Sequence, residues 1–366
     1  MKKILVISQG FWPEIFPINT IINNLSGNDF EIDILTGYPN YPKGKFFSGY
    51  RPYKITVTKK KKNKILRVPI ISRGINSKLR IIFNYISFII SSIIFGSYYL
   101  RKQKYEIILV YATSPIFQAY IGIFFKYLKK AKLVTWVQDL WPNVLKDTGI
   151  IKSKFLLEII KIFVKRIYDS NDLILSQSKS FKKDIKKITK TKISVMHNPG
   201  YSEKKIFKSK FNKKINILYA GNIGNAQPWE ILVNFLNSEN HKMINLTICG
   251  DGQKYNYIKK FLVANKINNI YLKGFVKGKK LEKYYKKNNY LLLMLKPGKD
   301  LNKTIPSKFQ TYLFYKKPII ALSDGEVYEF IKKNNLGFAS KSNNKKEIKK
   351  MFEKIISLKE KNYNKI

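Results

Sequence analysis

The stretch that decides the fold is "INILYAGNIGNAQPWE", residues 215–230. Its continuous apolar run, 215–220, is typical of a strand buried on both faces of a sheet. Gly221 permits a turn that a side chain would block, Gly224 lets the backbone approach a ligand closely, and a helix is expected to begin near Ala226. We therefore expect a phosphate to bind the N–H groups of this loop, with an ordinary strand-to-helix turn as the alternative.

The same alternation of apolar runs and helical patterns extends along the rest of the chain. Since helices between the runs supply right-handed crossovers, the pattern predicts parallel sheets. The expected strands lie at residues 3–9, 31–37, 105–112, 132–139, 172–178, 192–198, 215–221, 244–250, 269–275, 290–296 and 317–323.

One long polar, lysine-rich stretch interrupts this alternation and divides the chain. The predicted α/β fold thus has a Rossmann-like domain in residues 1–197, a linker at 198–214, a second Rossmann-like domain in 215–344 and a terminal helical segment at 345–366. The run "KKKKNK", residues 59–64, is expected to be a solvated hairpin turn or loop.

The charge of the chain directs attention to acidic partners. Lys and Arg number 70 against 23 Asp and Glu, a formal net charge of +47. Nucleic acid, anionic lipid and phosphate-bearing substrates all fit this sign, and so does a genome whose base composition favours lysine codons. The lysines are scattered and no nucleic-acid-binding module is recognised, so a nucleic-acid-binding protein remains only an alternative.

Cysteine content and the amino terminus bear on the compartment. Cys249 is the only cysteine, which excludes disulfides within the chain and zinc sites built from several cysteines, and it fits a reducing cytoplasm. The apolar run in "MKKILVISQG" is too short for an export signal.

Residues 81–100 form an uncharged segment between basic flanks. Its length allows a membrane span. Arg80, Asn84, Ser87 and Ser91 give one weakly polar stripe, however, which favours a helix lying on a surface. Three interpretations stay open: a crossover helix on the first sheet, a helix docked at the interface of a membrane, and a span. The helical pattern at 153–168, apolar with basic edges, can extend the same surface.

Loops after the expected strands of the first domain should open toward a ligand. "QGFWPEIFPIN" (9–19) and "TGYPNYPKG" (36–44) supply aromatic and proline residues for such a lining. In "WVQDLWPNVLKDTG" (136–149), Asp139 closes a strand, where it can orient a hydroxyl or cap the next helix. The candidate residues of this lining are Gly10, Glu14, Tyr38, Tyr41 and Trp141, with Gln138 and Asp139 as the candidate catalytic residues.

The stretch "KTIPSKFQTYLFYKKPIIA", residues 303–321, provides a cation in the second domain. Pro306 fits the first turn of a helix, and Ser307 can bond exposed N–H groups there. Lys308 would then lie at the positive end of the helix, which is unfavourable unless an anion joins it. A diphosphate is a reasonable ligand; the alternative is an exposed lysine on a surface helix.

These motifs, in this order, resemble the retaining glycosyltransferases of family 4, and more narrowly the WbuB-like transferases of O-antigen and capsule assembly. The resemblance runs from Lys3 to about Gly337 and implies a GT-B fold, in which two Rossmann-like domains face each other across a cleft and the terminal helix returns toward the first domain. It rests on "TGYPNYPKG", "QDLWP", "SQSKSF", "HNPG", "YAGNIGNAQ", "CGDG", "PSKFQTYLFYKKPIIA" and "DGE".

The resemblance also implies roles for individual residues. Asp139 and Gln138 would face the sugar and the acceptor, and the "CGDG" stretch would lie near the nucleotide base. The two glutamates common in the family are replaced here by Lys303 and Thr311, so the usual contact with the ribose is altered. The donor-binding residues implied are Gly221, Asn222, Gly224, Gly250, Ser307, Lys308 and Thr311.

The activity implied is a metal-independent, retaining transfer of a sugar from a UDP-sugar, with no cofactor. The resemblance suggests an N-acetylated deoxyhexosamine such as N-acetyl-L-fucosamine as the sugar and a polyprenyl-diphosphate-linked sugar as the acceptor. It implies a peripheral protein on anionic lipid at the cytoplasmic face of a bacterial inner membrane, serving O-antigen, lipopolysaccharide or capsule assembly. A nucleotide-sugar-binding protein that no longer catalyses is the alternative.

Overall fold

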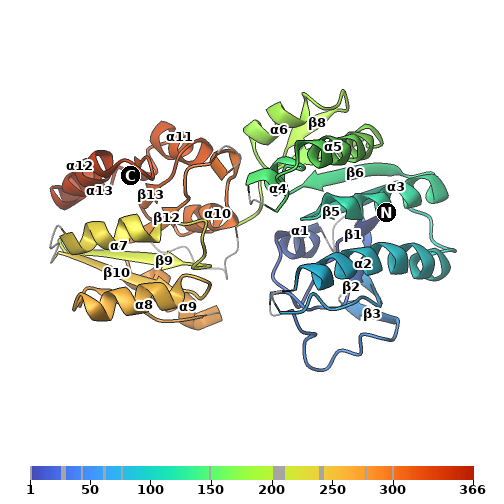
Figure 1. Cartoon of the computed structure of the whole chain (residues 1–366), viewed down its shortest axis with the longest axis horizontal. Helices are drawn as coiled ribbons and strands as arrows, with labels where there is room; N and C mark the ends of the chain where they lie inside the picture. The colour runs from blue at the N-terminus through green and yellow to red at the C-terminus, as the bar shows by residue number, and fades with distance from the viewer. Residues whose placement is uncertain are drawn as a thin grey trace. The chain divides into compact units, whose positions relative to one another are not determined.

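The computed structural model describes residues 2–25, 30–42, 44–60, 63–75, 77–147, 150–200, 211–238, 243–276, 278–298 and 301–366 (Figure 1). The chain forms two compact units, Met1–Pro199 and Gly200–Ile366. Each unit is built on one sheet with helices packed against it, so the predicted α/β class with two Rossmann-like domains is confirmed. Of the predicted linker, residues 201–210 lie outside the described residues.

The first unit contains an eight-stranded sheet in the order β3-β4-β2-β1-β5-β6-β7-β8. Its strands are β1 (Lys2–Ile7), β2 (Phe30–Gly37), β3 (Thr56–Lys60), β4 (Asn63–Val68), β5 (Ile107–Ala112), β6 (Lys132–Val137), β7 (Leu173–Ser176) and β8 (Ile193–Val195). All neighbours pair in parallel except β3 and β4. The prediction of an entirely parallel sheet is therefore wrong at this edge. Residues 59–60 and 63–64 of the predicted lysine-rich turn or loop belong to β3 and β4, and residues 61–62 lie outside the described residues.

Apolar side chains from the two faces of the first sheet form two separate clusters. One cluster includes Ile18 and Ile22 of α1 (Pro17–Leu25). The other contains buried residues of the remaining longer helices, such as Phe88, Phe125 and Ile167. These helices are α2 (Lys78–Tyr99), α3 (Ala119–Lys129), α5 (Lys154–Asp169) and α6 (Lys179–Ile185), and the short elements are η1 (Ile116–Gln118) and α4 (Asn143–Asp147).

Helix α2 has its polar residues turned inward. It packs against β2, β4 and α3, with Asn84, Phe88 and Ser92 fully buried. Asn84 accepts a hydrogen bond from Gln9 Nε2 at 2.7 Å. The outward face is apolar: Ile82, Ile86, Ile90 and Ile94 each keep about half of their surface exposed. The helix is thus a crossover helix on the first sheet, and its Leu79–Tyr99 segment is also long and apolar enough to cross a membrane by length and composition.

The second unit contains a six-stranded parallel sheet in the order β11-β10-β9-β12-β13-β14. This is the strand order of a dinucleotide-binding fold, with its switch point between β9 and β12. The strand β14 was not anticipated from the sequence. The strands are β9 (Ile215–Ala220), β10 (Ile244–Cys249), β11 (Ile270–Leu272), β12 (Tyr290–Met294), β13 (Ile319–Leu322) and β14 (Gly337–Ser340).

Helices cover the second sheet, and their apolar residues form two clusters with it. The terminal segment belongs to this unit, because Ile348, Phe352 and Tyr363 pack in the same cluster as the β9 residue Ile217. Its predicted return toward the first unit stays a prediction. The helices are α7 (Trp229–Ser238), α8 (Tyr255–Ala264), α9 (Gly278–Lys287), η2 (Leu301–Lys303), α10 (Ser307–Phe314), α11 (Glu326–Lys333), α12 (Lys345–Ile356) and α13 (Glu360–Tyr363).

Candidate active site

The loops after β9 and β10 pack backbone against backbone at the carboxyl edge of the second sheet. A Cβ on Gly250 would lie 1.8 Å from the carbonyl oxygen of Gly221, and a Cβ on Gly252 would lie 2.6 Å from that of Ile223. Only glycine fits at such separations. The "CGDG" stretch therefore lies beside the 221–225 loop and fixes its shape.

The N–H groups of the 221–225 loop are largely engaged within the protein. Gly221 N donates to the carbonyl of Cys249, Ile223 N to the carbonyl of Asp251, and Gly224 N to the side chain of Gln227, each at 2.9 Å. The prediction that this loop binds phosphate through its N–H groups is wrong for these three donors. The turn also delays the helix, which begins at Trp229 and not near Ala226.

Lys308 brings a cation to this loop from the first turn of α10. Its ammonium lies 3.9 Å from the centre of the Tyr219 ring. A Cβ on Gly221 would lie only 2.8 Å from Lys308 Nζ, so the glycine makes room for the ammonium. Tyr219 is held in turn by its hydroxyl, which donates to the carbonyl of Asn222 at 2.6 Å. The structure thus brings together three of the predicted donor-binding residues, Gly221, Asn222 and Lys308.

The environment of Lys308 disfavours its own charge. Burial lowers the pKa of Lys308 to about 7. Across the described ranges no carboxylate forms an ion pair with it. A cation in such a place is stabilised when an anion binds beside it. The arrangement therefore suits a phosphate ligand better than it suits the empty protein.

The other two predicted residues of α10 lie close to Lys308 in the chain. Ser307 is exposed and is the first residue of the helix, while Pro306 occupies the capping position and not the first turn. Thr311 donates from Oγ1 to the carbonyl of Ser307 at 3.3 Å. A ribose contact by Thr311 stays a prediction.

In the first unit, Asp139 follows β6 and is held by the loop after β5. Its Oδ2 accepts from the N–H of Ser114 at 3.0 Å and from the Ser114 hydroxyl at 2.8 Å. Trp141 Nε1 donates to the same hydroxyl oxygen at 3.1 Å. Asp139 thus bonds the neighbouring loop, and not the N–H groups of α4 as the capping alternative supposed. Burial raises the pKa of Asp139, and the two bonds from Ser114 oppose that shift.

Gln138 combines deep burial with an unused donor. Only 7 % of the residue is exposed, and among the described residues its Nε2 has no hydrogen-bond partner. Its backbone carbonyl accepts from Gln177 Nε2 at 2.5 Å, and the Gln177 carbonyl lies 2.7 Å from His197 Nδ1. A buried donor without a partner is costly, which points to a ligand as its acceptor.

The loops after β1 and β2 are tied together by a buried carboxylate. Glu14 Oε1 accepts from the N–H of Asn40 at 2.7 Å and from that of Tyr41 at 2.6 Å. Burial raises the pKa of Glu14, while these bonds lower it. Gly10 lies in the same turn, where a Cβ would come within 2.3 Å of the Phe16 ring. Gly10 and Glu14 therefore shape the loops, and contact with an acceptor stays a prediction for both.

The predicted aromatic lining divides into buried and accessible residues. Tyr38 is 1 % exposed and its hydroxyl donates to the carbonyl of Lys54, so the prediction that it contacts an acceptor is wrong. Trp141 is also buried and packs edge-on against Phe117. Tyr41 is 44 % exposed and is the one member of this aromatic trio open to a ligand.

Two further functional candidates, Ser114 and Arg73, have neighbours that lie far away in the chain, so no local motif marks them. Ser114, which holds Asp139, follows β5 without a recognisable motif. Arg73, in the loop after β4, lies 5.4 Å from the centres of both the Tyr41 and the Tyr85 rings. Basic residues are so common in this chain that composition gave no signal for Arg73.

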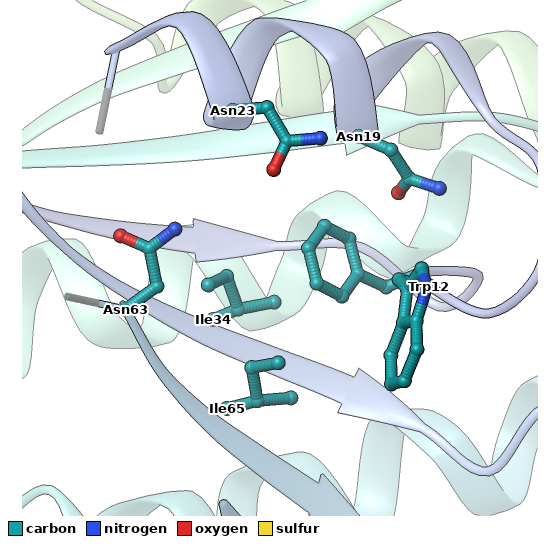
Figure 2. A pocket seen from close by; sticks show the side chains of 7 residues that line it. Trp12, Asn19, Asn23, Ile34, Asn63 and Ile65 are labelled. Carbon is teal, nitrogen blue, oxygen red and sulfur yellow. The ribbon is translucent and has the colours of Figure 1, made fainter. Parts of the chain in front are cut away.

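A small pocket in the first unit lies between α1 and the β2–β4 strands (Figure 2). Its volume is about 20 Å³, enough for about one water molecule and too small for a sugar. It is lined by Phe11, Trp12, Asn19, Asn23, Ile34, Asn63 and Ile65. Within the described ranges, no group of three His, Cys, Asp or Glu side chains is placed to hold a metal ion.

Comparison with known proteins identifies the second unit. Residues 202–366 match the family described as "Glycosyl transferases group 1". The matched segment coincides with the second unit. No curated protein matched the sequence.

Solved structures with the same fold span almost the whole chain. Sucrose-phosphate synthase (tll1590) from Thermosynechococcus elongatus is 12% identical, with a TM-score of 0.72, and the alignment covers 98% of this chain and 90% of that one. The lipopolysaccharide outer core galactosyltransferase WaaB is 14% identical, with a TM-score of 0.64 and coverage of 97% and 90%. Anabaena Alr3699/HepE in complex with UDP and glucose is 11% identical, with a TM-score of 0.62 and coverage of 98% and 90%.

These structures have the GT-B fold, which confirms the predicted fold class. The family match and the structural neighbours together support a glycosyltransferase, the enzyme class that the sequence predicted.

Proposed function

We propose that this glycosyltransferase moves a sugar from a UDP-sugar to a hydroxyl of a polyprenyl-diphosphate-linked sugar, with retention at the anomeric carbon and without a metal ion. The observation that carries the proposal is Lys308, a half-buried cation 3.9 Å from the centre of the Tyr219 ring and without a carboxylate partner in the described ranges, at the switch point of the second sheet. A diphosphate supplies the missing charge. The UDP found in the HepE structure supports the choice of donor.

The chain's own residues suit a reaction limited by departure of the diphosphate. The bond from the anomeric carbon to the diphosphate oxygen breaks, its electron pair leaves with UDP, and the acceptor oxygen bonds to the same face of the sugar. The proton of the acceptor passes to the leaving phosphate oxygen. In the second unit, Lys308 stabilises the charge that develops there. In the first unit, Asp139 and the Nε2 of Gln138, which has no hydrogen-bond partner among the described residues, orient the acceptor.

The outer surface of the first unit supports a lipid-linked acceptor. Helices α2, α3 and α5 are neighbours, and each exposes large apolar side chains. Basic residues such as Arg101 and Lys161 accompany them, so anionic lipid is the complementary surface. The exposed apolar residues are Leu79, Ile82, Phe83, Ile86, Ile90, Ile94, Tyr98, Tyr99, Tyr127, Leu128, Phe155, Leu156, Ile162 and Phe163. We call this set the apolar helix face.

From this face we propose a peripheral protein at the cytoplasmic surface of a bacterial inner membrane. The WaaB structure, that of a lipopolysaccharide galactosyltransferase, supports a place in surface polysaccharide synthesis. Assembly of O-antigen or capsule with an N-acetylated deoxyhexosamine such as N-acetyl-L-fucosamine is the finer form of the proposal.

Product formation with a panel of donors tests the reaction. The protein is incubated with UDP- and GDP-sugars, EDTA and a short polyprenyl-diphosphate-linked N-acetylglucosamine, and both UDP release and sugar incorporation are measured. We expect incorporation from one UDP-sugar, and no incorporation by Lys308→Met. Binding of UDP without turnover of any donor would instead support the non-catalytic alternative.

Sedimentation with vesicles tests the membrane surface. Replacing Ile82, Ile86, Ile90 and Ile94 by Gln should abolish binding to vesicles that contain phosphatidylglycerol while leaving the melting temperature almost unchanged, because these side chains are about half exposed. Val263→Gln, at a 74 % exposed position of α8, is the matched control. Equal binding by the fourfold variant and the wild type would contradict the assignment.

A further inference from the structure

A guanidinium lies between two aromatic rings at the carboxyl edge of the first sheet. Arg73, in the loop that joins β4 to α2, has its Cζ 5.4 Å from the centre of the Tyr41 ring and 5.4 Å from that of Tyr85. Tyr41 comes from the loop after β2 and Tyr85 from the second turn of α2. Because β1, β2, β4, β5 and β6 run in parallel, this loop lies at the same edge as Asp139.

The backbone that carries Arg73 is fixed. Its N–H donates to Asn40 Oδ1 at 3.1 Å, and the next N–H, of Gly74, donates to the carbonyl of Gly44 at 2.9 Å. The two glycines have φ angles of +69° and +72°, and a Cβ on Gly44 would lie 2.0 Å from the Gly74 oxygen. The loops after β2 and β4 are thus hydrogen-bonded to each other, which fixes the backbone position of Arg73.

The charge of Arg73 is not neutralised by a carboxylate among the described residues. Arg67, in β4, provides a contrast, because that buried guanidinium donates to the backbone carbonyls of Gly37 and Trp12 and so has a structural role. A guanidinium beside two rings, with no carboxylate partner among the described residues, can still donate from two of its N–H groups to a phosphate.

The Arg73 position adjoins the candidate catalytic residues of the first unit. Tyr85 is close enough to both Arg73 and Asp139 for their charges to act on it. Tyr85 also belongs to α2, whose outward face, beginning with Ile82 and Ile86 beside it in the helix, is apolar. One helix therefore carries part of an anion site and an apolar surface.

We propose that Arg73, clamped by Tyr41 and Tyr85, binds a phosphate group of the acceptor, and that this phosphate is the headgroup of a lipid whose chain follows the outward face of α2. The inference rests on the proposed function, which names a diphosphate-linked acceptor, and assigns the residue that recognises that diphosphate. A soluble sugar phosphate offers the same chemistry without the chain.

The test compares three acceptors that carry the same terminal sugar. One is a short polyprenyl diphosphate sugar, one a sugar diphosphate without lipid, and one a neutral alkyl glycoside. KM and kcat are measured for the wild type, Arg73→Gln and Arg73→Lys. Arg51→Gln, which removes one exposed arginine from the same unit, is the control for charge.

Arg73→Gln should raise KM for the polyprenyl diphosphate sugar about 10- to 100-fold, as expected for a lost hydrogen bond to a charged group, and should leave KM for the neutral glycoside unchanged. Arg73→Lys should recover only part of the loss, because it keeps the charge and loses the planar, stacked fork. Calorimetric UDP affinity and the melting temperature should match those of the wild type in each variant.

Other outcomes overturn the inference or the function separately. Equal losses on the neutral and the phosphorylated acceptors would give Arg73 a structural role and remove the anion site. A wild-type KM for the sugar diphosphate as low as for the lipid-linked acceptor would refute the lipid assignment. If the wild type transfers to no acceptor while it binds UDP, the proposed function fails. Binding of inorganic diphosphate in the presence of saturating UDP, which occupies the Lys308 site, by the wild type but not by Arg73→Gln then still decides whether the anion site exists.

Discussion

The pH dependence of UDP binding is the most direct consequence of the environment of Lys308. In the free protein, burial lowers the pKa of this ammonium to about 7, from an ordinary value of 10.5. A bound diphosphate favours the charged form and returns the pKa at least to its ordinary value. Below pH 7 the lysine is already charged and binding needs no proton. Above pH 7 the free protein holds it neutral, so UDP binding must take up a proton and weakens as pH rises.

The magnitude follows from this difference in pKa. With a pKa of about 7 in the free protein, the dissociation constant of UDP should rise about eightfold between pH 7.5 and 8.5. At pH 8 only about a tenth of Lys308 is protonated before binding, so each UDP should take up about 0.9 proton. The second ionisation of a terminal phosphate, near pH 6, is complete across this range.

Isothermal titration calorimetry in buffers of different ionisation enthalpy measures both quantities. Lys308→Arg is the matched control, because arginine stays charged at these pH values and should give a flat profile without proton uptake. The control also accounts for Lys317, which is still present in Lys308→Arg. Burial lowers the pKa of Lys317 to about 8, and its ammonium donates to backbone carbonyls, so any proton uptake by Lys317 would appear in the control as well. A wild-type affinity that is constant from pH 7.5 to 8.5, with no proton uptake, would refute the assignment of Lys308 as a desolvated cation at the diphosphate.

Three further variants probe the residues assigned to the donor and to the reaction. Lys308→Met should raise the melting temperature, and more at pH 6 than at pH 9. Below pH 7 the wild type carries the full free-energy cost of burying the charged ammonium, and this cost decreases as pH rises toward 10.5. Thermal unfolding of the protein without UDP at both pH values measures the difference. Gly221→Ala places a Cβ 2.8 Å from Lys308 Nζ at a φ of +148°, so the UDP dissociation constant should rise at least tenfold, and an unchanged value in calorimetry would contradict the contact. Asp139→Asn can still accept from Ser114, so the fold and UDP affinity should persist while kcat falls about tenfold or more; an unchanged kcat would exclude an essential carboxylate.

Long apolar runs let the sequence predict most of the two sheets, and the misses have local causes. The strand β4 reads "NKILRV", in which lysine and arginine conceal a buried segment, because Arg67 is satisfied there by backbone carbonyls. The strand β14 is only "GFAS" and has no apolar run. Such strands exist because neighbouring strands complete their hydrogen bonds, which a pattern along one segment does not report.

Helix α2 shows why hydropathy did not fix orientation. The polar stripe was visible in the sequence, and it suggests a solvent-facing side when the rest of the helix is apolar. In the structure, Asn84 instead turns inward, because Gln9 and the carbonyl of Ile71 provide partners at 2.7 Å and 2.5 Å. Those partners come from two other loops, so the buried face could be known only once the sheet had brought them together.

The sequence predicted which loops form the candidate sites, but not which atoms within those loops are accessible or already hydrogen-bonded. Gly221 and Lys308 were both expected at the donor, yet only the fold shows that the glycine makes room for the ammonium and that nearby N–H groups are already bonded. Tyr38 and Tyr41 share one motif, and nothing in it tells the buried ring from the accessible one. Their hydrogen bonds and packing partners, Lys54 and Arg73, lie well outside the motif.

A net charge of +47 marks the whole chain as basic and for that reason locates nothing within it. Individual cations differ in how well their charge is solvated in the protein without a ligand. An exposed lysine is solvated by water and gains little from one more anion. Lys308 is half-buried and its charge is disfavoured by burial, and Arg73 lies beside two rings, so each has more to gain from a phosphate. Neutralising surface lysines should therefore lower vesicle binding in proportion to charge, while loss of either of these two cations should act on one substrate each.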